Sequence, residues 1–126
     1  MERLFWICLG GAAGAGTRYL VSVWAAERFG GPFPLGTLLV NLAGCFLLGL
    51  IMHATLTVAW SPTLRAAVTV GFLGGLTTYS SFNHETTSLL QHGAAGLGAL
   101  NALVTVVGSF VAGWLGLIVS RFLVGP

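Results

Sequence analysis

Two long stretches without a charged side chain constrain this chain more than any other feature of its sequence. They run from Phe29 to Leu64 and from Thr86 to Ser120, and each exceeds the roughly 20 apolar residues that cross a hydrocarbon core as a helix. Only 6% of the 126 residues are charged, against roughly 25% in soluble proteins. Because the apolar runs show no alternation, we expect an all-α membrane protein without strands.

Turn-forming segments divide the chain into one transmembrane domain, residues 1–126, with four spans. The expected spans cover about 4–27, 35–59, 66–91 and 96–122, separated by segments rich in glycine and proline. The first apolar segment lacks a strongly basic lead, so we expect a retained span rather than a cleaved signal peptide. Small residues four apart, such as Gly10 and Gly14, predict faces where helices approach closely.

The arginines give only a weak bias in orientation. The side that holds both termini would carry Arg3, Arg65 and Arg121, and the other side Arg28, with Arg18 nearby. Such a small difference predicts that the chain inserts in both orientations. Four helices also leave little room for a shielded polar pathway in one protomer. We therefore expect a dual-topology antiparallel homodimer in the lipid bilayer, in which a second copy covers the polar side chains.

The third span contains the stretch GFLGGLTTYSSFNHET, residues 71–86, which is unusually polar for a membrane crossing. Gly74 and Gly75 lack side chains and favour a break in the helix, and the hydroxyl residues after them can satisfy the backbone groups that a break frees. Irregular backbone at membrane depth is tolerated only where it is buried in protein or lines a cavity. Freed carbonyls that converge would suit a hard cation such as sodium.

Aromatic side chains follow the predicted break at helical spacing. Tyr79 and Phe82 are three residues apart, and the positive edges of their rings, together with the amide of Asn41, could hold a small anion without a fixed arginine. Weak binding of this kind suits conduction. Glu85 would repel an anion if ionised, so we consider three roles for it: a protonated acid, an orienter of Ser81 one turn earlier, or a vestibule group.

Polar side chains also recur every four residues in the second and fourth spans. The two stripes are Thr37, Asn41 and Cys45, and Asn101, Thr105 and Ser109. For Asn41, an interhelical hydrogen bond and a functional role both remain open. The fourth-span stripe is either the wall of a wet path or a set of hydroxyls that bond back to carbonyls four residues earlier.

Several classes of protein are not indicated by the motifs of this chain. There is no HExxH pair, nucleophile elbow or P-loop lysine, so we do not expect an enzyme. His53, His84 and His92 do not form a ligand spacing for zinc. Cys8 and Cys45 lie in apolar runs and are expected to be free thiols. A net charge of +2 gives no indication of a nucleic-acid partner.

Three segments resemble one known family: GFLGGLTTYSSFNHET, GTLLVNLAGCFLLG before it, and GAAGAGTRYLV near the start. They closely resemble the small bacterial fluoride channels, once named camphor-resistance proteins, and the likeness covers nearly the whole chain. The resemblance implies a fluoride-selective channel of the bacterial inner membrane that passively exports cytoplasmic fluoride. It also implies an antiparallel homodimer with two pores and a structural sodium ion at its centre.

By motif, the resemblance also implies a role for individual residues. The fluoride pore would be formed by Asn41, Tyr79, Phe82, Ser81, Glu85, Thr105 and Ser109. The backbone carbonyls of Gly74 and Thr77 would hold the sodium ion, and Arg18 would attract anions at the aqueous entrance. Tyr79 departs from the family, which often has phenylalanine there.

Two rival functions remain open from the sequence. One is a small proton-coupled exporter of multidrug or guanidinium compounds, which would need a carboxylate within the membrane. Glu85 would have to serve, because the first span has no acidic residue between Glu2 and Glu27. The other is a structural membrane subunit without transport activity, which would leave the polar stripes unexplained.

Overall fold

Three uninterrupted helices dominate the computed structural model, which describes residues 1–125 of the chain. Helix α1 spans Glu2–Phe29, α2 spans Leu35–Thr57 and α6 spans Ala95–Val124. Each is long and apolar enough to cross a membrane. No strand occurs in residues 1–125, so the all-α expectation is confirmed. Helices α1 and α6 contain the residues expected for the first and fourth spans, and α2 ends at Thr57, two residues before the expected end of the second.

The segment between α2 and α6 is helical but interrupted. It comprises α3 (Pro62–Ala66), the π-helical stretch η1 (Ala67–Leu73), the single turn α4 (Gly74–Leu76) and α5 (Tyr79–Gln91). Ser61 caps its start, because the Ser61 hydroxyl accepts a hydrogen bond from the backbone N–H of Leu64 over 3.1 Å. The Pro62 ring occupies the first turn, where its missing N–H costs nothing.

The break lies at Thr77 and Thr78, not at the glycines where the sequence predicted it. Gly74 has helical angles of φ −65 and ψ −35, whereas the ψ angles of Thr77 and Thr78 are 153 and 116, which are extended. Gly75 instead packs against α1, where an added Cβ would lie 2.5 Å from the carbonyl oxygen of Gly11. The predicted position of the break was wrong because Gly75 serves close packing against α1 and Gly74 continues the helix.

Glycines allow the backbones of two pairs of helices to pack closely, and we call each such contact a glycine seal. In the first pair, α1 lies against η1 and α4, and a Cβ on Gly14 would lie 2.8 Å from the backbone nitrogen of Leu76. In the second pair, α2 lies beside α6, and a Cβ on Gly116 would lie 2.9 Å from the backbone nitrogen of Leu50. Close backbone approach of this kind stabilises helix pairs in lipid, where apolar burial gives no advantage.

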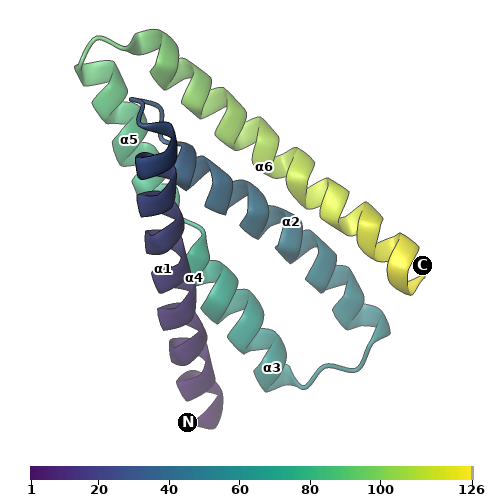
Figure 1. Ribbon diagram of the computed structural model, residues 1–126. Helices are drawn as coiled ribbons and strands as arrows, with labels where there is room; N and C mark the ends of the chain where they lie inside the picture. Colours follow the sequence, from purple (N-terminus) through teal and green to yellow (C-terminus); the bar gives the residue numbers. More distant parts are fainter. Residues whose placement is uncertain (126) are drawn as a thin grey trace.

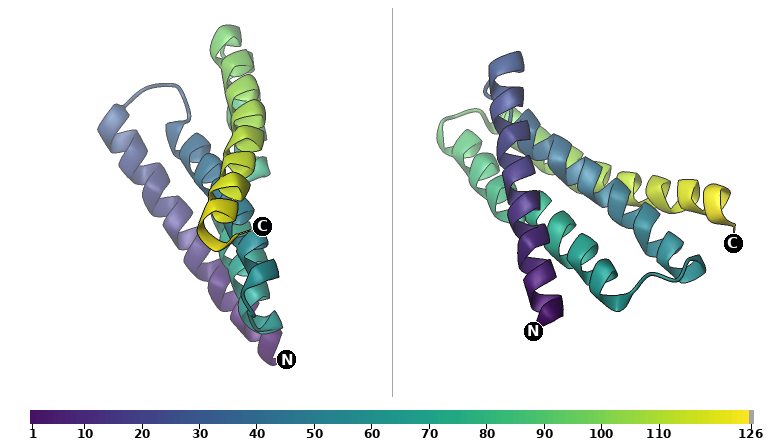
Figure 2. Two further views of the ribbon diagram at one scale, coloured as in Figure 1. Left: turned by 90° about the vertical axis from the view of Figure 1, so that its right-hand side faces the viewer. Right: turned by 60° about the horizontal axis from the view of Figure 1, so that its bottom comes forward.

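The four helical segments alternate in direction, with α2 and α6 running the same way (Figure 1). The α1 helix crosses the interrupted segment, and the turn from α5 into α6 lies at the end of the molecule opposite the N-terminus. Figure 2 shows the same arrangement from two further sides. Many large apolar side chains on the outer faces are exposed, including Phe110 at 79% and Trp114 at 67%, which suits contact with lipid.

Candidate functional site

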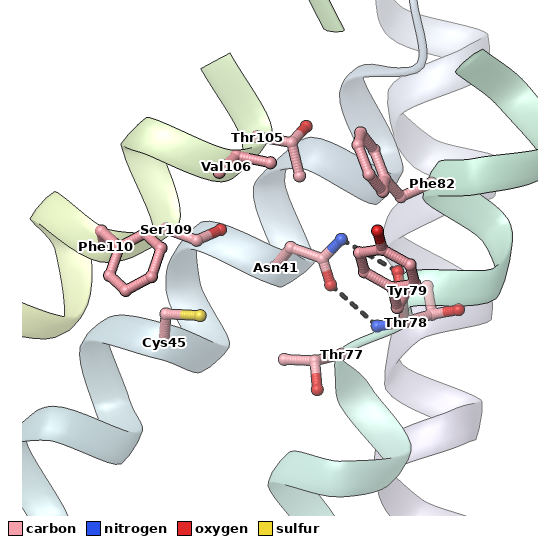
Figure 3. A pocket seen from close by; sticks show the side chains of 10 residues that line it. All are labelled: Asn41, Cys45, Thr77, Thr78, Tyr79, Phe82, Thr105, Val106, Ser109 and Phe110. Atoms are coloured by element: carbon pink, nitrogen blue, oxygen red, sulfur yellow. Dashed lines mark hydrogen bonds between the residues drawn. The ribbon is translucent and has the colours of Figure 1, made fainter. Parts of the chain in front are cut away.

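A cavity of about 390 Å³, which we call the groove, opens where the break faces α2 and α6 (Figure 3). It is lined by Asn41, Cys45, Thr77, Thr78, Tyr79, Phe82, Thr105, Val106, Ser109 and Phe110. Five of the seven side chains predicted for the pore are therefore brought together from α2, α5 and α6. The groove is mostly apolar, and none of its lining residues carries a charge.

The Asn41 side chain forms a double hydrogen bond with the backbone at the break. The backbone N–H of Thr78 donates to Asn41 Oδ1 over 2.7 Å, and Asn41 Nδ2 donates to the carbonyl of Thr78 over 3.1 Å. Both residues are buried, so these bonds satisfy backbone groups that lipid could not. A carboxamide nitrogen carries two protons, and Asn41 therefore keeps one N–H for a further acceptor.

Two contacts at the break leave two backbone carbonyls without their usual helical hydrogen bonds. In an unbroken helix the N–H of Thr78 would donate to the carbonyl of Gly74, but here it donates to Asn41. Likewise the N–H of Ser81 would reach the carbonyl of Thr77, but it donates to the Thr78 hydroxyl over 3.1 Å as a helix cap. The two carbonyls that the family resemblance implies as sodium ligands are thus left without their helical partners.

An aromatic pair stands at the start of α5. The ring centroids of Tyr79 and Phe82 are 5.4 Å apart and their planes are inclined by 59°. Phe82 is buried, with 6% of its surface exposed, whereas Tyr79 is 77% exposed. The Phe82 ring therefore forms part of the groove wall, and Tyr79 reaches out of the protomer beside the opening (Figure 3).

The wall that α6 contributes presents two hydroxyl residues in different ways. Figure 3 shows the Ser109 hydroxyl directed across the groove toward Asn41. The Thr105 hydroxyl points away, and its methyl group faces the groove. The proton of Thr105 is donated to Asn101 Oδ1 over 3.3 Å. The i, i+4 spacing left a wet wall and back-bonded hydroxyls both open, the resemblance implied that both residues line the pore, and the spacing contains no signal that separates them.

Glu85 lies on a different side of α5 from the groove. Its Oε1 accepts a hydrogen bond from the Thr37 hydroxyl over 2.7 Å, and its Oε2 is buried without a hydrogen-bond partner in residues 1–125. Both residues line a second cavity of about 190 Å³ beneath the connection between α1 and α2. Arg18 lines neither cavity, and Ser81 belongs to the Thr78 cap. Their roles in a pore stay predictions.

Comparison with known proteins gives a family for this arrangement. The family described as "CrcB-like protein, Camphor Resistance (CrcB)" matches residues 5–117. The chain belongs to this family. The resemblance drawn from the three sequence segments is therefore confirmed. With its long apolar helices, this member of the CrcB-like family is a multi-pass protein of the bacterial inner membrane.

Individual relatives of this CrcB-like chain are similar over their whole length. A protein of Sorangium cellulosum (strain So ce56) is 50% identical over 125 residues, which cover 98% of each chain. A protein of Anaeromyxobacter sp. (strain K) is 50% identical over 126 residues, covering 99% of this chain and 100% of the relative. A third, from Citrifermentans bemidjiense, is 49% identical over 124 residues. All three bear the name fluoride-specific ion channel FluC.

Proposed function

We propose that this chain forms a fluoride-selective channel that lets fluoride leave the cytoplasm passively. The observation that carries the proposal is a groove between α2, α5 and α6 whose free hydrogen-bond donors are uncharged. These are the second N–H of Asn41, the hydroxyl of Ser109 and the ring edge of Phe82. The name shared by the relatives points to the same ion.

Uncharged donors in a narrow path suit a small anion that must enter and leave quickly. Donors replace the water that the ion gives up, and the absence of an arginine from the groove wall keeps binding weak enough for release. Fluoride is smaller than chloride and accepts stronger hydrogen bonds. We therefore expect chloride to fit poorly between the Phe82 ring and the wall of α6.

A second copy of the chain would complete this site. Five polar side chains on α5 are exposed in the protomer: Ser80, Asn83, His84, Thr87 and Gln91. Lipid cannot satisfy such a stripe, and Tyr79 beside it is also exposed. We infer that the stripe and the open side of the groove are covered by a partner protomer. The weak arginine bias favours an antiparallel, dual-topology homodimer, with the interrupted segment as the fourth crossing of each chain.

The break also offers ligands for a sodium ion. The carbonyls of Gly74 and Thr77 lack their helical partners, and uncharged oxygens suit a hard monovalent cation. One protomer offers two such carbonyls, and a hard cation takes more oxygen ligands than that. A second copy would bring the number to four, so we place the ion at the dimer interface. Its role there would be structural, because it would balance the carbonyl dipoles that the break exposes.

The remaining predicted residues have supporting contacts outside the groove. Glu85 and Thr37 line the second cavity, which we propose as a vestibule or as an extension of the ion path. Ser81 keeps the cap of α5 in place through Thr78. Arg18 would draw anions toward the aqueous entrance by its charge.

Anion efflux from liposomes that hold the purified protein tests the function. We expect fluoride to leave rapidly when a counter-ion pathway is supplied, and chloride to leave far more slowly. Protein-free liposomes measure the leak. Rapid chloride efflux without fluoride efflux would contradict the proposal. Uptake of an organic cation driven by a proton gradient, abolished in Glu85→Gln, would support the rival exporter instead.

A further inference from the structure

Asn101 lies behind the groove and has no place in its lining. This α6 residue is 1% exposed, which makes it one of the most deeply buried side chains of the chain. A buried carboxamide within a membrane span is costly unless its polar atoms find partners. The partners of Asn101 therefore show what the side chain does.

Three consecutive hydrogen bonds, which we call the relay, lead from Thr105 on α6 through Asn101 to α5, and all three point in the same direction. The Thr105 hydroxyl donates to Asn101 Oδ1 over 3.3 Å. Asn101 Nδ2 then donates to the Thr86 hydroxyl oxygen over 2.9 Å. The Thr86 hydroxyl donates in turn to the backbone carbonyl of Phe82 over 2.7 Å. Each hydroxyl gives its only proton to the next member, and bonds arranged in this way polarise and strengthen one another.

Both ends of this relay belong to the groove. Thr105 forms part of the α6 wall, and Phe82 supplies the aromatic wall of α5. The bond from Asn101 to Thr86 is the side-chain hydrogen bond that joins α5 to α6 within residues 1–125. The other side-chain bonds that hold α5 and the break, from Thr37 and Asn41, come from α2.

We propose that Asn101 is a positioning residue that sets the width of the groove and the donors that face it; this proposal rests on the proposed fluoride channel. By accepting the Thr105 proton, Asn101 holds the Thr105 methyl toward the groove and leaves Ser109 as the α6 donor to an anion. By donating to Thr86, it fixes the turn of α5 that carries the Phe82 ring. Without the relay the groove would widen, and the efflux of chloride, the larger ion, would increase most.

Fluoride and chloride efflux should be compared for the native protein, four single variants and one double variant. Asn101→Leu keeps the approximate volume and removes both hydrogen bonds, and Thr86→Val removes the hydroxyl that α6 engages. For both we expect the ratio of fluoride to chloride efflux to fall by about tenfold or more, because buried polar atoms lose their partners. Thr86→Ser keeps the hydroxyl and should keep the ratio within about threefold of native.

Thr69→Val is the matched control, because Thr69 lies on η1 and its hydroxyl bonds back to the carbonyl of Arg65 on α3, outside the relay. The double variant of Asn101→Leu with Thr86→Val should be no worse than Asn101→Leu alone, since the two changes break the same bond. Native selectivity in Asn101→Leu, or additive losses in the double variant, would overturn the proposal. If Asn101→Leu does not fold, the contrast between Thr86→Val and Thr86→Ser decides it.

A second measurement separates this inference from the channel function. Para-fluorophenylalanine placed at Phe82 reports on the environment of that ring by fluorine resonance in detergent, without any transport. We expect the resonance to shift or broaden in Asn101→Leu and Thr86→Val, and to stay in place in Thr69→Val. A native protein that does not conduct fluoride would refute the channel, while this resonance would still test Asn101. An unchanged resonance in both relay variants would overturn its positioning role.

Discussion

The Asn41 carboxamide and the Thr78 peptide pair through two hydrogen bonds of opposite direction, over 2.7 and 3.1 Å. The pattern is that of two backbones in a sheet, except that one partner is a side chain. It allows α4 to end and α5 to begin at membrane depth without an unsatisfied Thr78 peptide. One side chain thus holds the break open and also keeps a donor for the groove.

Asn41→Leu should therefore affect stability as well as transport. The substitution leaves the buried N–H and carbonyl of Thr78 without partners, at a cost of about 1–3 kcal/mol for each. We expect a lower thermal unfolding temperature in detergent and fluoride efflux slowed by at least about tenfold. Unfolding followed by circular dichroism and efflux followed with a fluoride electrode measure the two effects. An unfolding temperature equal to that of the native protein would show that the pairing is not needed.

The glycine seal between α1 and the interrupted segment predicts a sharp positional contrast. A Cβ on Gly14 would lie 2.8 Å from the backbone nitrogen of Leu76, whereas a Cβ on Gly16 would meet no atom within 4 Å. Gly14→Ala should destabilise the fold by about 1–3 kcal/mol through overpacking. Gly16→Ala should be neutral or slightly stabilising, because alanine favours the helix by up to about 1 kcal/mol. Equal unfolding temperatures for the two variants would contradict the seal.

The sequence predicted the spans more fully than the site, for a physical reason. Apolar length and turn residues are local signals, and they located α1, α2 and α6 directly. The position of the break was missed because a glycine can free the backbone, admit a neighbouring helix or simply continue its own helix. In the fold Gly75 admits α1 and Gly74 continues the helix. Thr77 and Thr78, which carry the break, look like ordinary hydroxyl residues in the sequence.

The direction in which each polar side chain points was the other feature that the sequence could not predict. Thr37 and Asn41 share a face by spacing, yet Thr37 bonds to Glu85 while Asn41 bonds to the break. Thr105 and Ser109 also share a stripe, and only the contact of Thr105 with Asn101 turns its hydroxyl from the groove. Contacts between residues far apart in the chain determine these directions.

Ser109→Ala and Thr105→Val should therefore give different results. Removal of the Ser109 hydroxyl deletes a donor that faces the groove, so fluoride efflux should fall by about tenfold while the unfolding temperature stays near native. Removal of the Thr105 hydroxyl leaves Asn101 Oδ1 buried without a donor, so the unfolding temperature should fall and efflux should suffer less. Efflux and unfolding measured on the same preparations make the comparison. The opposite ranking of the two efflux rates would contradict the assignment of Ser109 as the donor.

Dual topology predicts that each connection appears on both sides of the membrane. Ala59→Cys and Ala95→Cys place a thiol at exposed positions in the connection after α2 and at the start of α6. In a population that inserts both ways, a membrane-impermeant maleimide applied from outside should label about half of each variant. The native chain, whose Cys8 and Cys45 lie in the spans, gives the background. Complete labelling of one variant and none of the other would establish a single orientation.

The pairing of helices also dictates an order of assembly during synthesis. Helix α1 can pack against η1 and α4 only after these segments have been synthesised. Helix α2 can likewise pack against α6 only after α6 has been synthesised. Neither pair is formed by neighbours in the chain, so each early span must wait in the bilayer with its small-residue face open. A chain that stops before α6 would leave the α2 face unpaired and available to another molecule. The last span to be inserted is thus the one that pairs with α2 and supplies the α6 wall of the groove.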